Sequence, residues 1–320
     1  MASGQPDAVA APAVRKSGRS RGLGSWSPAS LIFVGPALVM LAIFLVYPVI
    51  NTLYLSLYGG LGFDAGRLRF VGLGNYIKLL TTDKAFLNLH FPPAGALFNN
   101  VLWLILFVPG VVLIGLVIAV VAARVRYEAF MKAVVFLPMA IAATALGVIW
   151  EFVYAPDRDT GLLNAILGIF NIGPISWLGR PEIVNYALIV VGIWGAAGFA
   201  TVVLSAALKS ISTEILEAAR VDGATEGQIF WRVIVPMLSL PISVVAVTQV
   251  IGVIKLFDLI FVMTGGGPGT SSRVVAFTMF QEAFAANRGG YGAAVAVIML
   301  IILLPVIIFN IRRFRTEAVT

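Results

Sequence analysis

The chain has 320 residues, of which 60% are hydrophobic and only 12% are charged, and its mean hydropathy is +0.98. A water-soluble domain carries about 25% charged residues, so this composition excludes a soluble globular protein and indicates a chain embedded in lipid. The net charge of +7 does not indicate nucleic-acid binding, because the Lys and Arg residues flank apolar runs and form no stripe. The absence of cysteine excludes disulfides and thiolate metal sites.

The N-terminal segment, residues 1–27, is rich in Ala, Gly, Ser and Pro and has no apolar periodicity. Its basic residues are Arg15, Lys16, Arg19 and Arg21. This composition predicts a disordered basic arm. The apolar run that follows is too long for the hydrophobic region of a signal peptide, so we interpret it as a first membrane span. The chain is therefore expected to divide into this arm and a membrane domain over residues 28–320.

Six apolar runs are long enough to cross a bilayer, which takes about 20 mostly apolar residues. They cover residues 31–57, 98–123, 133–155, 184–208, 234–263 and 293–311. Each must be helical, because no water is present in lipid to satisfy the backbone. The sequence thus predicts an all-α membrane protein with six transmembrane helices. The single histidine, His90, falls outside these runs and is interpreted as an interfacial residue, since no second histidine could share a metal.

The distribution of Lys and Arg predicts how the spans are oriented. With the N-terminus inside, thirteen of these residues fall in cytoplasmic segments and eight in the much longer outer segments. Both termini are therefore expected in the cytoplasm. Only Lys255 lies within a span. Asp258 follows three residues later, which would let the two side chains pair on one helix; this pair could be a structural lock between helices or a direct contact for a solute.

A polar block interrupts the apolar pattern between the fourth and fifth spans, with the sequence EAARVDGATEGQIFWRVIVP over residues 217–236. Ser212 could cap a helix that carries Glu214 and Glu217 near its start. Gly223 is a position where the chain could turn with positive φ, and Pro236 would mark the start of the next span. The residues alone are equally consistent with an ordinary solvated loop and with a short helix–turn–helix that a partner grips.

This block resembles the EAA loop of the membrane subunits of bacterial ABC importers. The positions that match are Glu217, Ala218, Ala219, Asp222, Gly223, Ala224, Phe230, Ile234 and Pro236. Val235 departs from the usual Leu, and Ser212 stands where the family often has Pro. Further stretches, YPVINTLYLS, FVGLGNYIKLL, FLP, GLLN and FDLIFVMTGGGPG, are similar to carbohydrate importers of the maltose-transporter class. FNNVLWLILFVPG, VFLPMAI, TVVLSAALKSI and FNIRRFR are similar to alpha-glucoside permeases in particular.

The resemblance implies the type I ABC importer permease fold, with an EAA coupling helix within about residues 209–236 that lies on the cytoplasmic side. It also implies a multi-pass protein of the bacterial cytoplasmic (inner) membrane. The implied partners are a sister permease subunit in a heterodimer, two ATPase subunits and an extracytoplasmic sugar-binding protein. The chain would hold no cofactor, and ATP and Mg would bind the partner subunits. It lacks a Walker motif, so it is not expected to be an enzyme.

The resemblance also implies positions that face the sugar: Met139, Ala143, Gly192, Ala196, Gly252 and Leu256. Several of these positions are polar in the maltose relatives and apolar or small here. This difference puts a maltodextrin substrate in doubt and is consistent with a smaller or differently shaped glucoside. Lys255, Asp258 and Trp194 complete the predicted substrate path. Trp150, Tyr154 and Trp194 could stack on a pyranose, although for Trp150 and Tyr154 a place in the interfacial aromatic belt is favoured.

An ion-coupled secondary transporter and an intramembrane enzyme are the alternative classes of function. An ion-coupled secondary transporter would need coupling-ion sites and usually inverted repeats, and no motif recurs between the two halves of the sequence. An intramembrane enzyme would need a nucleophile and base or a metal site within the spans. The chain has no cysteine, and its one histidine lies outside the spans.

Overall fold

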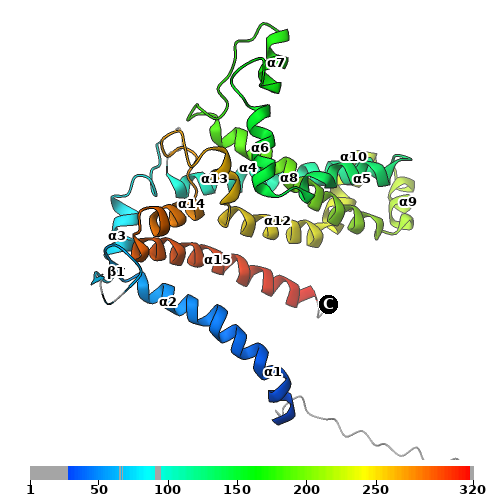
Figure 1. Ribbon diagram of the computed structural model, residues 1–320. Helices are drawn as coiled ribbons and strands as arrows, with labels where there is room; N and C mark the ends of the chain where they lie inside the picture. Colours follow the sequence, from blue (N-terminus) through cyan, green and yellow to red (C-terminus); the bar gives the residue numbers. More distant parts are fainter. Residues whose placement is uncertain (1–27, 65, 67, 91–94, 318–320) are drawn as a thin grey trace, which may run out of the picture. The chain divides into compact units, whose positions relative to one another are not determined.

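A computed structural model describes residues 28–64, 66, 68–90 and 95–317 of the chain (Figure 1). The predicted disordered arm, residues 1–27, lies outside the described residues. The chain divides into two compact units after Val49. The described part of the first unit contains helix α1 (Pro28–Leu41), the π-helical segment η1 (Ala42–Val46) and the start of α2 (Tyr47–Leu55). The apolar stretch Ile32–Leu55 is long enough to span a membrane, as the sequence predicts.

The second unit, Ile50–Thr320, contains all other elements. Its long spans are α4 (Ala96–Ala122), α8 (Val184–Lys209) and α15 (Gly289–Glu317). A hairpin of β1 (Tyr58–Gly59) and β2 (Arg69–Phe70) precedes the short helix α3 (Gly74–Thr81). Helix α7 (Leu162–Ile169) lies between the third and fourth predicted spans, and α14 (Val275–Phe280) with η4 (Gln281–Ala285) precedes α15. These spans confirm the second, fourth and sixth apolar runs of the sequence.

The third predicted span is not one straight helix. It consists of α5 (Glu128–Phe136), the 3₁₀ turn η2 (Leu137–Ala140) and α6 (Ala143–Val153), and the chain bends by 101° between η2 and α6. Pro138 lacks the N–H that would bond the carbonyl of Val134, which ends the regular α-helical ladder. The backbone is then extended at Ile141 and resumes as a helix at Ala143. The prediction of a single helix over residues 133–155 was therefore wrong.

The fifth predicted span is broken twice. Helix α10 (Glu226–Ile229), η3 (Phe230–Ile234) and α11 (Val235–Met237) run without a gap through Pro236, so this proline does not mark the start of the span. The chain then bends by 67° before α12 (Ser239–Ile254), because Pro241 cannot bond the carbonyl of Met237. A second break separates α12 from α13 (Asp258–Met263). With each bent pair counted as one span, the described residues contain up to six spans.

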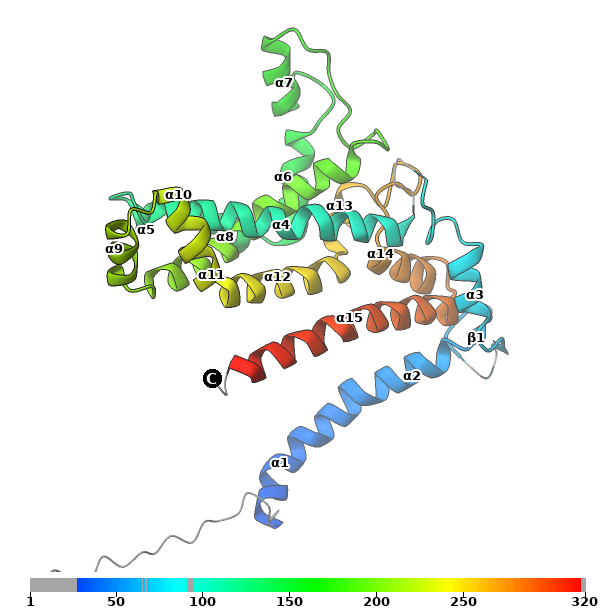
Figure 2. The same ribbon diagram turned by 180° about the vertical axis from the view of Figure 1, so that it is seen from behind.

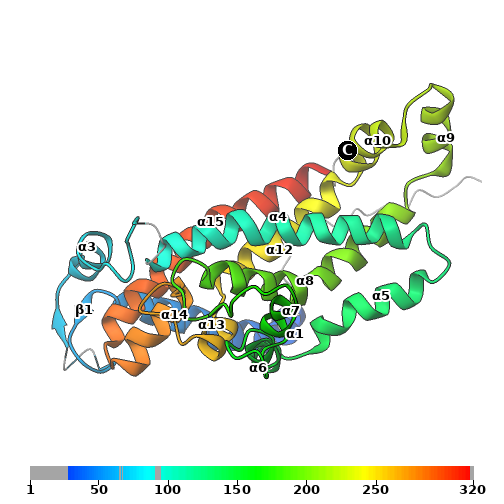
Figure 3. The same cartoon turned by 90° about the horizontal axis from the view of Figure 1, so that it is seen from above.

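The core of the second unit is built on the pairing of α4 with α8, which run side by side (Figure 3). Small residues allow this close approach. A side chain at Gly115 of α4 would collide with Ala200 of α8. Gly198 likewise lets α5 approach α8, since a Cβ there would come within 2.7 Å of the carbonyl oxygen of Val135. Lipid supplies little hydrophobic drive between helices, so such close packing is what holds them together. The pairing fixes the two helices against which α5, α6 and α12 pack.

Candidate functional site

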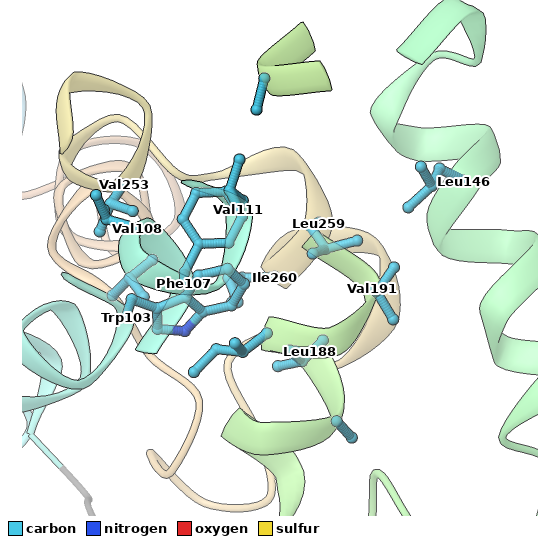
Figure 4. Close-up of a cluster of buried hydrophobic side chains, with 14 of the residues drawn as sticks. Trp103, Phe107, Val108, Val111, Leu146, Leu188, Val191, Val253, Leu259 and Ile260 are labelled. Atoms are coloured by element: carbon cyan, nitrogen blue, oxygen red, sulfur yellow. The ribbon is translucent and has the colours of Figure 1, made fainter. Parts of the chain in front are cut away.

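A cavity of about 270 Å³ lies where η2, α6 and α12 approach the α4–α8 pair. Figure 4 shows part of its wall, which includes Trp103 and Phe107 of α4 and Val191 of α8. The two rings are 5.6 Å apart and reach α8 because Gly192 has no side chain; a Cβ there would lie 3.0 Å from Trp103. The volume is close to the lower end of the range for small-molecule pockets, roughly 300–1,000 Å³.

Two breaks in the predicted spans help to form this cavity. The irregular segment at the 101° bend contributes Pro138, Met139 and Ile141, and the break after α12 contributes Leu256. Irregular backbone is tolerated at membrane depth only where protein buries it or where it lines a cavity. The break at Pro138 and the break after α12 therefore place irregular backbone at the wall of this cavity.

Six of the nine positions predicted for the substrate path line this one cavity. They are Met139, Ala143, Gly192, Ala196, Gly252 and Leu256. A Cβ at Gly252 would meet no atom within 4 Å, so this position faces open space. The structure thus brings together residues from three separate spans, as the sequence resemblance implies, while their contact with a solute stays a prediction.

The other three predicted path residues lie outside the cavity. Trp194 lines a separate apolar hollow of about 380 Å³ and packs against Trp150 with a ring distance of 5.6 Å. Lys255 lines a third hollow, with Phe257 and Met279. Asp258 is exposed and lines none of the hollows described for residues 28–317.

The expected pairing of Lys255 with Asp258 on one helix was wrong. Lys255 follows the last residue of α12, and Asp258 is the first residue of α13, so the helix breaks between them. Both side chains are exposed, and neither forms an ion pair within the described residues. The sequence spacing suggests a helical pair only if the helix is continuous, and the break removes that condition. Their influence on transport stays a prediction.

Gln249 is a site residue that the sequence analysis missed. It lines the cavity from α12, it is 91% buried, and its carboxamide makes no hydrogen bond to any described residue. Trp103 also contributes a buried indole N–H without a partner. Buried polar groups are normally hydrogen-bonded, so an unpartnered carboxamide at a cavity wall is available to a bound solute. A lone Gln within an apolar span is the sequence signal that could have identified it.

Tyr154 does not take the interfacial place that the sequence favoured. Only 4% of its surface is exposed, its hydroxyl donates to the carbonyl of Ala187 at 3.0 Å, and its ring lies 5.1 Å from Trp150 and 5.8 Å from Trp177. A ring enclosed in this way can neither stack on a sugar nor lie among lipid headgroups. Its role is to join α6 to α8.

A network of buried asparagines holds the end of the unit at which α4 and α8 begin. Asn99 donates to the carbonyls of Ser271 and Arg273 at 2.8 and 2.7 Å. Asn185 donates to Ser271 at 2.6 Å and to Asn99 at 3.2 Å. The network joins both helices to the loop between α13 and α14.

Asn100 supports the break after α12 in a similar way. Its carboxamide donates to the carbonyl of Val253 at 3.0 Å and accepts from the N–H of Val275 at 2.7 Å. It therefore satisfies a carbonyl at the end of α12 and an N–H at the start of α14, two groups that helix ends leave without partners.

The polar block forms an ordered helix–turn–helix with little burial. Helix α9 (Thr213–Val221) begins after Ser212, as expected, although the Ser212 side chain makes no capping bond. At its end Gly223 has φ +81°, which confirms the predicted turn. The N–H of Gly223 bonds Arg220 and that of Ala224 bonds Ala219, both at 3.0 Å, which is a Schellman motif. A capping box between Thr225 and Gln228 then starts α10.

The surface of this block is left open. Helix α9 has no buried residue, Val221 is 87% exposed, and Glu217, Ala218 and Asp222 are exposed. Glu226 pairs with Arg220 at 2.9 Å and with Arg124 at 3.4 Å, and the hydrogen bond to Glu226 raises the pKa of the Arg220 guanidinium. Local caps and surface ion pairs hold the block in shape, so its outer face is free to contact another protein.

Comparison with known proteins places this fold in a family. Residues 101–314 match the family described as "Binding-protein-dependent transport system inner membrane component". The chain is 43% identical over 290 residues to the osmoprotective compounds uptake permease protein GgtC of Synechocystis sp., covering 89% of this chain and 99% of GgtC. It is 39% identical over 292 residues to the alpha-glucoside transport system permease protein AglF of Rhizobium meliloti, covering 90% of this chain and 82% of AglF.

A solved structure is similar over most of the chain. It is a bacterial ABC transporter involved in the import of the acidic polysaccharide alginate, with a TM-score of 0.73 and 22% identity, covering 90% of this chain and 95% of that chain. This likeness shows the fold, and it confirms the predicted type I ABC importer permease architecture. Together with the family match, it identifies the chain as a member of the family of binding-protein-dependent transport system inner membrane components.

Proposed function

We propose that this chain forms part of the translocation path of an ATP-driven importer for an alpha-glucoside or a related di- or oligosaccharide. The cavity carries the proposal, because it gathers six predicted path positions around the unpartnered carboxamide of Gln249. The names of the relatives support the substrate class, since AglF is an alpha-glucoside permease and another relative is the trehalose/maltose permease MalF of Thermococcus litoralis, 28% identical over 298 residues. The family match lends no support to an ion-coupled transporter.

The proposal includes the partners that the sequence implies. A sister permease subunit would complete the path, two ATPase subunits would bind ATP and Mg and contact the polar block through Glu217 and its neighbours, and an extracytoplasmic binding protein would deliver the sugar. The alginate importer supports the last step, because it has been solved in complex with a pentasaccharide-bound periplasmic protein. Closure of the ATPases would then move the spans as rigid bodies and open the cavity alternately to the two sides.

Uptake by variants at the cavity wall tests the proposal. Gly252 faces open space, so Gly252→Ala should transport normally, while Gly252→Phe should fill the cavity and reduce uptake more than tenfold without loss of assembled protein. Gln249→Leu should lower uptake about tenfold, which corresponds to the ~1.4 kcal/mol of one hydrogen bond. The assay is uptake of maltose, trehalose and sucrose by cells that express the full transporter, with lactose for comparison. Normal uptake by Gly252→Phe would show that this cavity is not the path.

The proposed orientation, with both termini in the cytoplasm, has a separate test. The native chain has no cysteine, so single cysteines give no background with an impermeant thiol reagent. Asp159→Cys, in the exposed loop after α6, should react in intact cells, whereas Val221→Cys in the polar block should react only after the cells are opened. Labelling of Val221→Cys from outside would reverse the orientation.

A further inference from the structure

A basic pocket of about 410 Å³ lies between the β1–β2 hairpin, α3 and the start of α15, at the other end of the second unit from the polar block (Figure 2). Three cationic side chains line it: Arg69 from β2, Lys78 from α3 and Arg288 just before α15. Neither the sugar cavity nor the polar block uses these residues. The pocket therefore needs an explanation of its own.

The positive charge in this pocket is only partly balanced. Arg288 forms an ion pair with Glu282, and the carboxylate of Asp83 accepts a hydrogen bond from Tyr291 at 2.6 Å. Lys78 lies 5.2 Å from the centre of the Tyr291 ring. Neither Lys78 nor Arg69 has a carboxylate partner among the described residues. The pocket is thus left with two uncompensated cations, an arrangement that suits an anion.

The pocket lies at the level where two membrane-spanning helices end. Gly59, in its wall, comes four residues after the end of α2 at Leu55, and Arg288 directly precedes α15. Leu55 packs with Ala293 of α15, so the two helix ends are neighbours within the second unit. Cations at the end of a span lie at the height of lipid headgroups, where they attract anionic lipid.

The surroundings of the pocket are apolar and exposed. Phe70 is 62% exposed, Leu73 65%, Ile77 61% and Leu80 48%. Large apolar side chains next to basic ones on a short amphipathic helix are typical of a segment that lies in the membrane interface. A docking site for an acidic group of a soluble protein would explain the cations but not these apolar side chains, so the pattern favours lipid.

We propose that Arg69 and Lys78 bind the phosphate of an anionic phospholipid, while Phe70, Leu73, Ile77 and Leu80 enter the acyl region beside it. The bound lipid would hold the hairpin and α3 against the start of α15. The site itself does not depend on the proposed sugar specificity. With the proposed orientation, in which both termini are cytoplasmic, the site would face the outer leaflet.

The test measures lipid binding by the full transporter complex in detergent, with phosphatidylglycerol as the probe and phosphatidylcholine and inorganic phosphate as comparisons. Phosphatidylglycerol should raise the melting temperature of the complex and stay bound in native mass spectrometry. The double change Arg69→Gln with Lys78→Gln should weaken this binding at least tenfold. Lys84→Gln is the matched control, because Lys84 is exposed nearby but does not line the pocket, and it should bind as the unchanged protein does.

Three outcomes would overturn the proposal. Phosphatidylglycerol binding that is unchanged in the double variant would place any lipid site elsewhere. Equal stabilisation by inorganic phosphate would mean a site for a free anion. Lost affinity for the sugar-binding protein, with lipid binding intact, would mean a protein docking surface. Because the readout is lipid binding and not uptake, failure here would leave the proposed transport function untouched, and a negative uptake result would leave the lipid site standing.

Discussion

The two ends of the α4–α8 pair are held by different kinds of interaction. Where the helices begin, the buried carboxamides of Asn99 and Asn185 bond each other and the loop after α13. Where they end, the chain enters segments held by ion pairs on the surface, Arg124 with Glu226 and Lys209 with Glu128. Buried polar groups that are hydrogen-bonded to one another fix one arrangement, while exposed ion pairs contribute little and can exchange partners. The first end is suited to hold the cavity in place and the second to receive a partner.

The largest effect is expected from removing the buried network. Asn99→Leu leaves the carbonyl of Arg273 without its side-chain donor and removes one of the two donors to the carbonyl of Ser271, which keeps Asn185. A buried group left without a partner costs roughly 1–3 kcal/mol. We expect a clear fall in the melting temperature and in the yield of folded protein, measured by thermal unfolding of the purified chain. Asn51→Leu is the control, because Asn51 is exposed on α2 and should tolerate the change. Equal stability of Asn99→Leu and Asn51→Leu would mean that the network does not hold this end.

A smaller, local effect is expected in the turn of the polar block. Gly223 has φ +81°, a conformation that costs a side chain about 1–2 kcal/mol, although Asn adopts it more readily than other residues. Gly223→Val should therefore speed hydrogen exchange of the α9 amides while the melting temperature stays nearly constant. The exchange rate of these amides in Gly223→Asn should lie between the rates in Gly223→Val and in the unchanged chain. A global loss of stability in Gly223→Val would show that this end is as tightly coupled to the core as the other.

The smallest effect is expected from the surface ion pairs. Glu226→Gln removes the charge that contacts both Arg220 and Arg124, but all three side chains are more than half exposed. The midpoint of thermal unfolding should stay unchanged at moderate salt. If Glu226→Gln lowered this midpoint as much as Asn99→Leu, the distinction between the two ends would fail.

The sequence predicted the parts of this fold that depend on local pattern. Apolar length predicted the four unbroken spans, and the positive φ at Gly223 follows from the residue itself. The bends were not predicted, because a proline in a span can be tolerated or can break the helix, and Pro109 lies inside α4 while Pro138 lies at a break. Neighbouring helices decide which occurs.

Only those residues of the candidate site that align with motifs of the related permeases were predicted. Six path positions came from the resemblance, and the structure gathers them in one cavity. Gln249 was missed although a lone Gln in an apolar span is a sequence signal, because its burial without a hydrogen-bond partner among the described residues is seen only in the structure. Lys255 and Asp258 were placed on one helix because the spacing was read as if that helix continued. Both errors concern long-range packing.

The central claim is that the polar block receives an ATPase subunit, and the most direct test is co-purification of the ATPase with a Glu217→Lys chain. Glu217 is exposed on α9, so the change should leave the spans inserted and the sister subunit bound. Glu182→Lys, exposed at the opposite end of α8, is the matched control. We expect that Glu217→Lys loses the ATPase and sugar-stimulated ATP hydrolysis while Glu182→Lys keeps the ATPase. Full ATPase binding and full sugar-stimulated turnover with Glu217→Lys would contradict it.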